Sequence, residues 1–195
     1  MGQTRLMIIN DENKFVFISV PKTGSTSIRR RLGSFEDPPP EIYHMSIEDV
    51  LKQYPHVKDY FKFAFVRNPY DRIFSTYINL KYDGHHWATE LKGKETFREF
   101  VLDFKNSEYS KYIHLQPQSS CVKIGGNLAV DFLGKFENLQ KDFRKVEEIL
   151  NLEPVPLIKI RVSSKDKEPK IIDQQMKDII YDIYREDFES FGYER

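Results

Sequence analysis

The sequence contains almost no cysteine and no long apolar run. Cys121 is the single cysteine among 195 residues, so no internal disulfide can form and the fold does not depend on an oxidising compartment. No window approaches the roughly 20 apolar residues of a membrane helix, and the N-terminus lacks the apolar core of a signal peptide. We therefore expect a cytoplasmic chain without a membrane segment.

Net charge is also missing. Thirty Lys and Arg residues balance thirty Asp and Glu residues, so no overall field attracts the chain to nucleic acid, and any anion site must be local. No internal repeat or low-complexity tract is found. Hydrophobic residues make up 39% and aromatic residues 14% of the chain, which excludes global disorder and predicts one globular domain over residues 1–195.

The first half of the chain alternates strand and helix patterns. Two β-favouring runs, 5–9 and 15–20, flank the polar residues 10–13 and predict a hairpin. A helical pattern runs from Ser25 to Gly33, and further strand and helix patterns occupy 63–66 and the residues after Pro69. This order predicts an α/β fold with a central parallel sheet and helices on both faces in three layers.

The remaining elements are predicted from periodicity and capping residues. Ser46 is the expected N-cap of a short helix, and short strands are expected at 121–124 and 130–133. Further helices are expected at 96–104, 139–150 and 173–184.

Residues 20–27 read Val-Pro-Lys-Thr-Gly-Ser-Thr-Ser and connect a predicted strand to a predicted helix. Backbone amides at a helix N-terminus converge on anions, Gly24 allows close backbone approach, and Lys22 supplies a cation. Hydroxyl donors are supplied by Thr23, Ser25, Thr26 and Ser27. The pattern predicts a phosphate-binding loop, whereas an isolated Gly-Ser pair would more simply mark a helix cap beside a solvated lysine.

This loop differs from the P-loop of nucleoside triphosphatases. In that loop the lysine comes late, directly before the helix, whereas Lys22 comes early. No aspartate-bearing strand suited to holding Mg²⁺ follows. A small-molecule kinase is therefore the less favoured alternative.

The loop resembles the 5′-phosphosulfate loop of sulfotransferases that use 3′-phosphoadenosine 5′-phosphosulfate (PAPS). It is similar to that of the Golgi carbohydrate enzymes and their bacterial relatives, and especially to that of heparan sulfate 2-O-sulfotransferase. The resemblance implies a P-loop-kinase-like fold, PAPS as sulfuryl donor and no metal. It also implies that Lys22 stabilises the departing phosphate and that Thr26 and Ser27 hold the 5′-phosphate.

A second segment resembles the 3′-phosphate motif of the same family. Arg67 follows the predicted strand 63–66, and Ser75 comes eight residues later on the next helix. The forked guanidinium of an arginine suits a phosphate. The alternative is a local ion pair between Arg67 and Asp71 with Ser75 as a surface hydroxyl. Two motifs in the family's order favour PAPS binding.

Sulfuryl transfer to a hydroxyl requires a base, and histidine suits this role near neutral pH. The surroundings of His44 resemble the segment where heparan sulfate 2-O-sulfotransferase carries its catalytic histidine. We therefore predict His44 as the base, with the His85-His86 pair as the alternative. That pair lacks a third ligand with convincing spacing, so a metal site is not expected.

The expected acceptor is a hydroxylated compound, specifically a glycan, because relatives act on carbohydrates. Candidate residues for a sugar site are Tyr82, Trp87 and Gln118. The resemblance also implies that Lys165 lies in a segment that closes over PAPS. A location in the Golgi lumen is expected if the chain is a trimmed catalytic part, and a non-catalytic nucleotide-binding protein of the same fold remains the second alternative.

Overall fold

The computed structural model describes residues 9–33, 44–82, 96–158 and 168–195. They divide into two compact units, the first from Met1–Val66 and Gln118–Ile160 and the second from Arg67–Pro117 and Arg161–Arg195. We call them unit 1 and unit 2. The single functional domain over residues 1–195 stays a prediction.

Unit 1 is built on a sheet of four strands in the order β1-β2-β3-β6. β1 (Ile9–Asn10) pairs antiparallel with β2 (Phe15–Ile18), which confirms the predicted hairpin. β3 (Phe61–Val66) pairs in parallel with β2 on one side and with β6 (Phe132–Lys135) on the other. The predicted α/β class with a mostly parallel sheet is confirmed.

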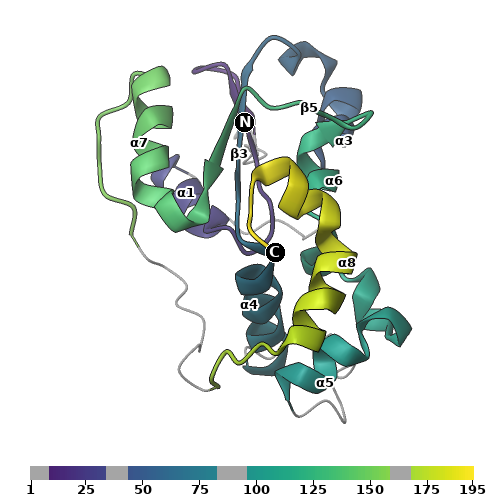
Figure 1. The fold of residues 1–195 in the computed structure, drawn as a ribbon. Helices are drawn as coiled ribbons and strands as arrows, with labels where there is room; N and C mark the ends of the chain where they lie inside the picture. The colour runs from purple at the N-terminus through teal and green to yellow at the C-terminus, as the bar shows by residue number, and fades with distance from the viewer. Residues whose placement is uncertain (1–8, 34–43, 83–95, 159–167) are drawn as a thin grey trace. The chain divides into compact units, whose positions relative to one another are not determined.

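Helices cover both faces of this sheet. On one side of β3 lie α1 (Ser25–Arg31) and α7 (Leu139–Ile149), and on the other lie α3 (Ile47–Gln53) and α6 (Ser119–Val122) (Figure 1). All four residues of β2 and the last four of β3 are buried. Because alternate strand residues point to opposite faces, both faces of the sheet carry buried apolar side chains. The core beside α1 and α7 is formed by Phe15, Phe17, Ile28, Phe63, Phe65, Phe143 and Val146.

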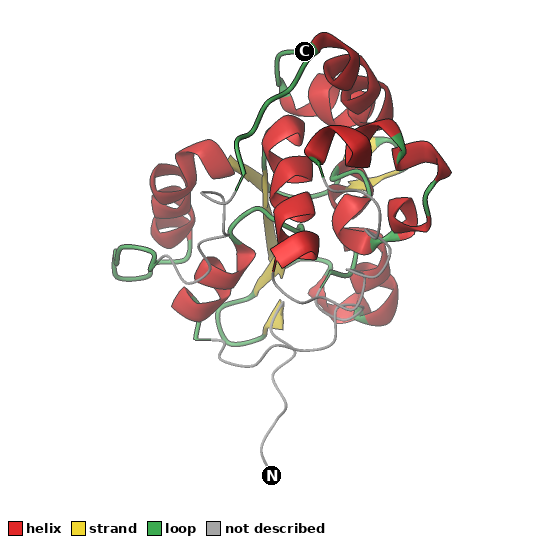
Figure 2. Ribbon diagram, turned by 90° about the horizontal axis from the view of Figure 1, so that it is seen from below, coloured by secondary structure: helices red, strands yellow, loops and turns green. Residues whose placement is uncertain are grey.

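The segment before β6 differs from the predicted pair of strands. Cys121 and Val122 belong to α6, and the glycine pair 125–126 turns a small ribbon of β4 (Lys123–Ile124) and β5 (Asn127–Leu128). Figure 2 shows this ribbon apart from the main sheet. Both glycines adopt positive φ, so the chain turns between β4 and β5, and only Lys123 and Ile124 of the predicted strand 121–124 belong to a strand.

Capping residues explain several boundaries. Ser46 accepts a hydrogen bond from the Asp49 amide, so α3 begins where the sequence predicted. The 3-10 turns of unit 1, Pro55–Val57 and Phe136–Asn138, lead into β3 and α7. Thr96 and Glu99 form a capping box at the start of α5 (Phe97–Leu102) in unit 2.

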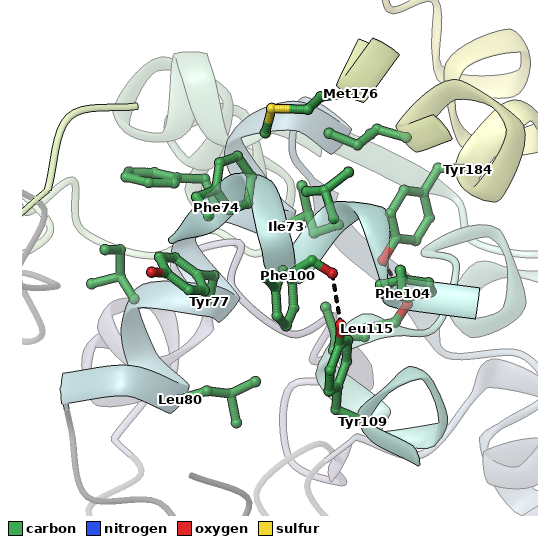
Figure 3. Close-up of a cluster of buried hydrophobic side chains, with 14 of the residues drawn as sticks. Ile73, Phe74, Tyr77, Leu80, Phe100, Phe104, Tyr109, Leu115, Met176 and Tyr184 are labelled. Carbon is green, nitrogen blue, oxygen red and sulfur yellow. Dashed lines mark hydrogen bonds between the residues drawn. The ribbon is translucent and has the colours of Figure 1, made fainter. Parts of the chain in front are cut away.

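Unit 2 is helical. α4 (Pro69–Tyr82), α5 and α8 (Gln174–Phe191) pack around an aromatic core, part of which Figure 3 shows. Three short 3-10 helices add residues to this core: Phe104–Asn106, Glu108–Lys111 and Ile113–Leu115. The buried Tyr109 hydroxyl donates to the Phe100 carbonyl at 2.7 Å, so an aromatic ring is buried without an unsatisfied hydroxyl.

α8 is longer than the predicted helix 173–184. Asp173, predicted as the first helical residue, is the N-cap. The helix continues past a non-helical Tyr184 (φ −116°) to Phe191, and Gly192 ends it at φ 63°. Phe188 and Phe191 are buried, so their packing extends the helix. Within the described residues, no helix is long and apolar enough to cross a membrane.

Candidate active site

The predicted phosphate loop connects β2 to α1 in unit 1. Gly24 is the N-cap of α1 and has φ 81°. The positive φ favours glycine, and a Cβ at this position would lie 2.8 Å from Leu139 Cδ2 and 3.2 Å from Phe136 Cε2, so these side chains would have to shift to admit a larger residue. Lys22 also has positive φ, 67°, which is uncommon for a residue with a side chain. The loop is thus held in a specific and locally strained conformation.

The hydroxyl-bearing residues of the loop differ in burial and in hydrogen bonding. Thr23 is buried and its hydroxyl donates to the Val20 carbonyl at 2.9 Å, so this side chain fastens the loop. The amide of Ser27 donates to the Gly24 carbonyl at 3.0 Å and closes the first turn of α1. Ser25 is buried, whereas Thr26 and Ser27 are half-buried. The structure therefore brings the predicted loop residues together in one turn.

His44 lies in the same unit, only 7% exposed. Its Nδ1 is 2.6 Å from the carbonyl oxygen of Ser19, the residue directly after β2. A carbonyl oxygen only accepts hydrogen bonds, so Nδ1 carries the hydrogen and the lone pair of the neutral ring is on Nε2. That tautomer is the one in which Nε2 can accept a proton.

The surroundings of His44 favour the neutral ring. Its pKa is lowered from 6.5 to about 4, mainly by burial and to a smaller extent by the positive charges of Arg29 and Lys22, while the Ser19 hydrogen bond acts in the opposite direction. At neutral pH the ring is therefore unprotonated, which is the form a general base needs.

Arg29 is the residue of this site that the sequence analysis did not identify. It is only 2% exposed, whereas its neighbours Arg30 and Arg31 are half-buried. It follows Ser25 by four residues, so both side chains lie on the same face of α1. That spacing from a phosphate-loop serine was the available indication.

Arg67 and Ser75 belong to unit 2. Arg67 precedes α4 and is 4% exposed, and Ser75 lies on α4 and is 3% exposed. Asn68, between Arg67 and the start of α4, caps that helix: its side-chain oxygen accepts a hydrogen bond from the Tyr70 amide at 2.9 Å. Asp71 pairs with Lys170 at 2.5 Å. Because Ser75 is buried, it is not the surface hydroxyl that the alternative to a 3′-phosphate site required.

Other predicted residues divide into two groups. Lys165, His85, His86 and Trp87 lie outside the described residues. Among the acceptor candidates, Gln118 is buried in unit 1, and the Tyr82 hydroxyl donates to Glu168 in unit 2 at 2.6 Å. In the described part of the chain, no group of three or more His, Cys, Asp or Glu side chains is placed to hold a metal ion.

Comparison with known proteins identifies the class. The sequence profile of the Sulfotransferase family matches residues 5–194, so the chain belongs to this family, whose members are PAPS-dependent enzymes. The predicted family is confirmed at this level.

Individual relatives are distant. The chain is 23% identical to mouse (Mus musculus) carbohydrate sulfotransferase 11, over 96% of this chain and 66% of that protein. It is 22% identical to human (Homo sapiens) carbohydrate sulfotransferase 9, over 95% of this chain and 52% of that protein. An uncharacterized protein of Archaeoglobus fulgidus is 28% identical over 58% of this chain and 86% of its own length. The chain thus spans about half to two thirds of the length of the two named relatives, and no solved structure matches it significantly.

Proposed function

We propose that this chain transfers a sulfuryl group from PAPS to a hydroxyl group of an acceptor, and that the acceptor is a carbohydrate. The observation that carries the proposal is the cluster in unit 1, where the phosphate loop, a buried arginine and a neutral buried histidine occur together. Family membership supports the donor, and the names of the two distant relatives support the class of acceptor.

The chemistry of the loop fits an anionic donor. PAPS, when bound, supplies the sulfuryl group and a phosphate leaving group. Gly24 allows the left-handed backbone at the start of α1, and the positive charges of Lys22 and Arg29 act on His44. We assign the 5′-phosphate to Lys22 and the loop residues Thr23, Gly24, Ser25, Thr26 and Ser27.

The 3′-phosphate is assigned to Arg67 and Ser75, with Lys165 as a further contact to the donor. Arg67 suits this role because a guanidinium donates two parallel hydrogen bonds to phosphate oxygens. The burial of both side chains is consistent with a role other than solvated surface. The 3′-phosphate is what distinguishes PAPS from ATP.

His44 is assigned as the general base. Its Nε2 takes the proton that the acceptor hydroxyl loses as the hydroxyl oxygen bonds to sulfur. The bond between sulfur and the 5′-phosphate oxygen breaks in line, and its electron pair remains on the phosphate. Lys22 stabilises that developing negative charge, so the chain's two catalytic side chains act at opposite ends of the transfer.

Radiolabelled transfer tests the proposal directly. The chain is incubated with PAPS carrying ³⁵S and with an array of glycans, and the expected result is label on a glycan hydroxyl. Calorimetry with PAPS, adenosine 3′,5′-bisphosphate and ATP-Mg²⁺ separates the alternatives. Tight binding of ATP-Mg²⁺ alone would indicate a kinase, and PAPS binding without transfer to any acceptor would indicate a binding protein.

Single-turnover transfer identifies the base. We expect His44→Ala to bind PAPS as the unmodified chain does and to slow transfer by roughly 100-fold or more. His86→Ala is the matched control, because it removes the alternative histidine. A wild-type rate in His44→Ala together with a slow His86→Ala moves the base to the second histidine and leaves sulfuryl transfer intact.

Two further expectations belong to the proposal. The three-layer arrangement of P-loop kinases is the expected finer fold class, and an experimental structure with adenosine 3′,5′-bisphosphate tests it. The expected location is the cytoplasm, or the Golgi lumen for a trimmed form, and fractionation of cells that express the natural gene product distinguishes the two.

A further inference from the structure

The phosphate loop depends on the helix that follows it. Lys22 has a φ of 67°, and a residue with a side chain keeps such a backbone angle only where the surrounding structure fixes it. The loop continues directly into α1, a helix of 7 residues, and a helix this short is not stable in water by itself. The conformation of the loop is therefore set by the packing of α1 against the rest of unit 1.

The helix α7 supports α1 near both of its ends. At the start of α1, a Cβ on Gly24 would lie only 2.8 Å from Leu139 Cδ2, so the loop backbone lies close against the start of α7. At the other end, Arg31 is the last residue of α1 and forms an ion pair with Glu147 of α7. These two points of contact are about 10–12 Å apart along each helix at 1.5 Å per residue. The two helices therefore run in the same direction, and α1 is held at each end.

The contact at the end of α1 is a buried ion pair. Arg31 Nε donates to Glu147 Oε1 at 2.9 Å, Arg31 Nη2 lies 2.9 Å from the same oxygen, and the Glu147 side chain is only 1% exposed. The same carboxylate oxygen accepts from the Val155 amide at 3.2 Å, and Arg31 Nη2 donates to the Glu153 carbonyl. The pair thus joins α1, α7 and the segment that follows α7 at one point.

A contribution to stability does not by itself account for this pair. Glu147 Oε2 is buried, and the residues that the structure describes offer it no hydrogen-bond donor. A buried carboxylate with one unsatisfied oxygen costs free energy, and buried ion pairs often contribute no more than apolar residues of similar size. A charged pair does fix direction, because an arginine and a carboxylate meet only in a narrow range of geometries.

We infer that Arg31 and Glu147 are positioning residues for the donor: their buried ion pair fixes the end of α1 to α7 and thereby holds the phosphate loop at the start of α1 in the conformation that receives the phosphosulfate. The inference rests on the proposed function. It extends that function to two residues that lie outside the loop.

A double variant separates positioning from stability. Arg31→Met with Glu147→Gln removes both charges and keeps side chains of similar size, so the urea midpoint of unfolding should change little. The affinity for adenosine 3′,5′-bisphosphate, measured by calorimetry, should fall roughly 10-fold, because a loop that is no longer held in its binding conformation must be ordered by the ligand. Arg31→Lys, which keeps the ion pair, should bind the bisphosphate as the unmodified chain does.

Lys145→Met is the matched control on α7, because Lys145 pairs with Asp142 at 3.0 Å through a side chain that is 53% exposed. Its affinity for the bisphosphate should stay at the wild-type value. Affinity reports only on molecules that are folded, so a loss of stability alone does not change it. A double variant that binds the bisphosphate as tightly as Lys145→Met overturns the inference, whether or not its urea midpoint has fallen.

Hydrogen exchange followed by NMR reports on the loop without ligand. The amides of Ser27 and Ile28 donate to the Gly24 carbonyl at 3.0 and 3.3 Å and close the first turn of α1. Both should exchange roughly 10-fold faster in the double variant than in Lys145→Met. Equal exchange rates overturn the inference. If the double variant does not fold, Glu147→Gln alone takes its place in both measurements, with the same expected direction.

The proposed function fails separately. Calorimetry that detects no bisphosphate binding to the unmodified chain overturns the assignment of the donor site and the positioning role with it. Bisphosphate binding that is equal in the unmodified chain and the double variant overturns only the positioning role and leaves sulfuryl transfer in place.

Discussion

Unit 1 and unit 2 each bury an arginine on a helix, but they surround its charge differently. In unit 2, Arg72 donates to the carbonyl oxygens of His114 at 3.0 Å and Gln116 at 2.7 Å, and it lies 4.0 Å from the Asp187 carboxylate. In unit 1, the charge of Arg29 acts on His44, which must stay neutral beside it. The first arrangement pairs a buried charge with carbonyl and carboxylate oxygens, whereas in the second a buried charge lowers the pKa of an imidazole in the same unit.

Unit 2 also contains a polar cluster around Glu168 in which, as around Arg72, each charged group has hydrogen-bonding partners. Glu168 accepts hydrogen bonds from the hydroxyls of Tyr77 and Tyr82 and from the Lys81 ammonium group. Burial acts to raise the pKa of this carboxyl, but these donors outweigh burial and lower it. The donors and the acceptor satisfy each other, so we regard this cluster as support for the end of α4.

The largest effect should come from breaking the structural arginine. Arg72→Leu leaves the Asp187 carboxylate buried without its partner charge, so we expect the free energy of unfolding to fall by about 3–5 kcal/mol. Urea denaturation measures the change. Arg185→Leu is the control in the same unit, because Arg185 pairs with Asp182 at the surface and should change stability by less than about 1 kcal/mol. Equal losses in the two variants would contradict the structural role of Arg72.

Removal of the loop lysine should affect chemistry rather than folding. Lys22→Ala should lower turnover at saturating PAPS by roughly 10²–10³-fold, because the charge matters most where the leaving phosphate becomes negative. Affinity for adenosine 3′,5′-bisphosphate should change little. Lys14→Ala is the control: Lys14 also has positive φ, 52°, but lies in the β1–β2 turn. Unchanged turnover in Lys22→Ala would contradict the assignment of Lys22 to the departing phosphate.

The free energy of unfolding should fall at acid pH because His44 is buried in its neutral form. Its pKa is about 4 in the folded chain, against the 6.5 of an unburied ring, so the unfolded chain binds the extra proton between these values. The stability contribution is therefore complete above pH 6.5 and is lost as the pH falls towards 4, by about 3 kcal/mol. Urea denaturation of the unmodified chain and of His44→Gln at pH 7 and pH 4 measures the difference. The same pH slope in both chains would show that His44 is not the group responsible.

The smallest of these effects concerns the donor's 3′-phosphate. Arg67→Ala should weaken PAPS binding by roughly 10–100-fold, the loss expected for a charge-assisted hydrogen bond. Adenosine 5′-phosphosulfate, which has no 3′-phosphate, serves as the control ligand and should bind both chains equally. Calorimetry compares the four combinations. Equal losses for the two ligands would remove Arg67 from the 3′-phosphate site.

Local patterns in the sequence predicted much of the fold. The hairpin, α1, α3, β3, α4 and α7 follow from apolar periodicity and capping residues, and the structure confirms them. The phosphate loop was predicted because Gly24 and its neighbours carry their chemistry in residue type and order. The helix α6 at Cys121 and Val122 and the continuation of α8 past Tyr184 were not predicted, since backbone angles and packing against distant residues decide them.

Residue type and order established which groups are available: an early lysine, a glycine at the helix start, an arginine and a serine eight residues apart, and a histidine on the connector. Folding added that Arg29 is buried while Arg30 is half-buried, and that the ring of His44 is held by the Ser19 carbonyl. Burial and charge act on a protonation state through space, and residues 25 positions apart have no sequence pattern that records their contact. The chemistry of each residue is local, but the state in which it works is set by the fold.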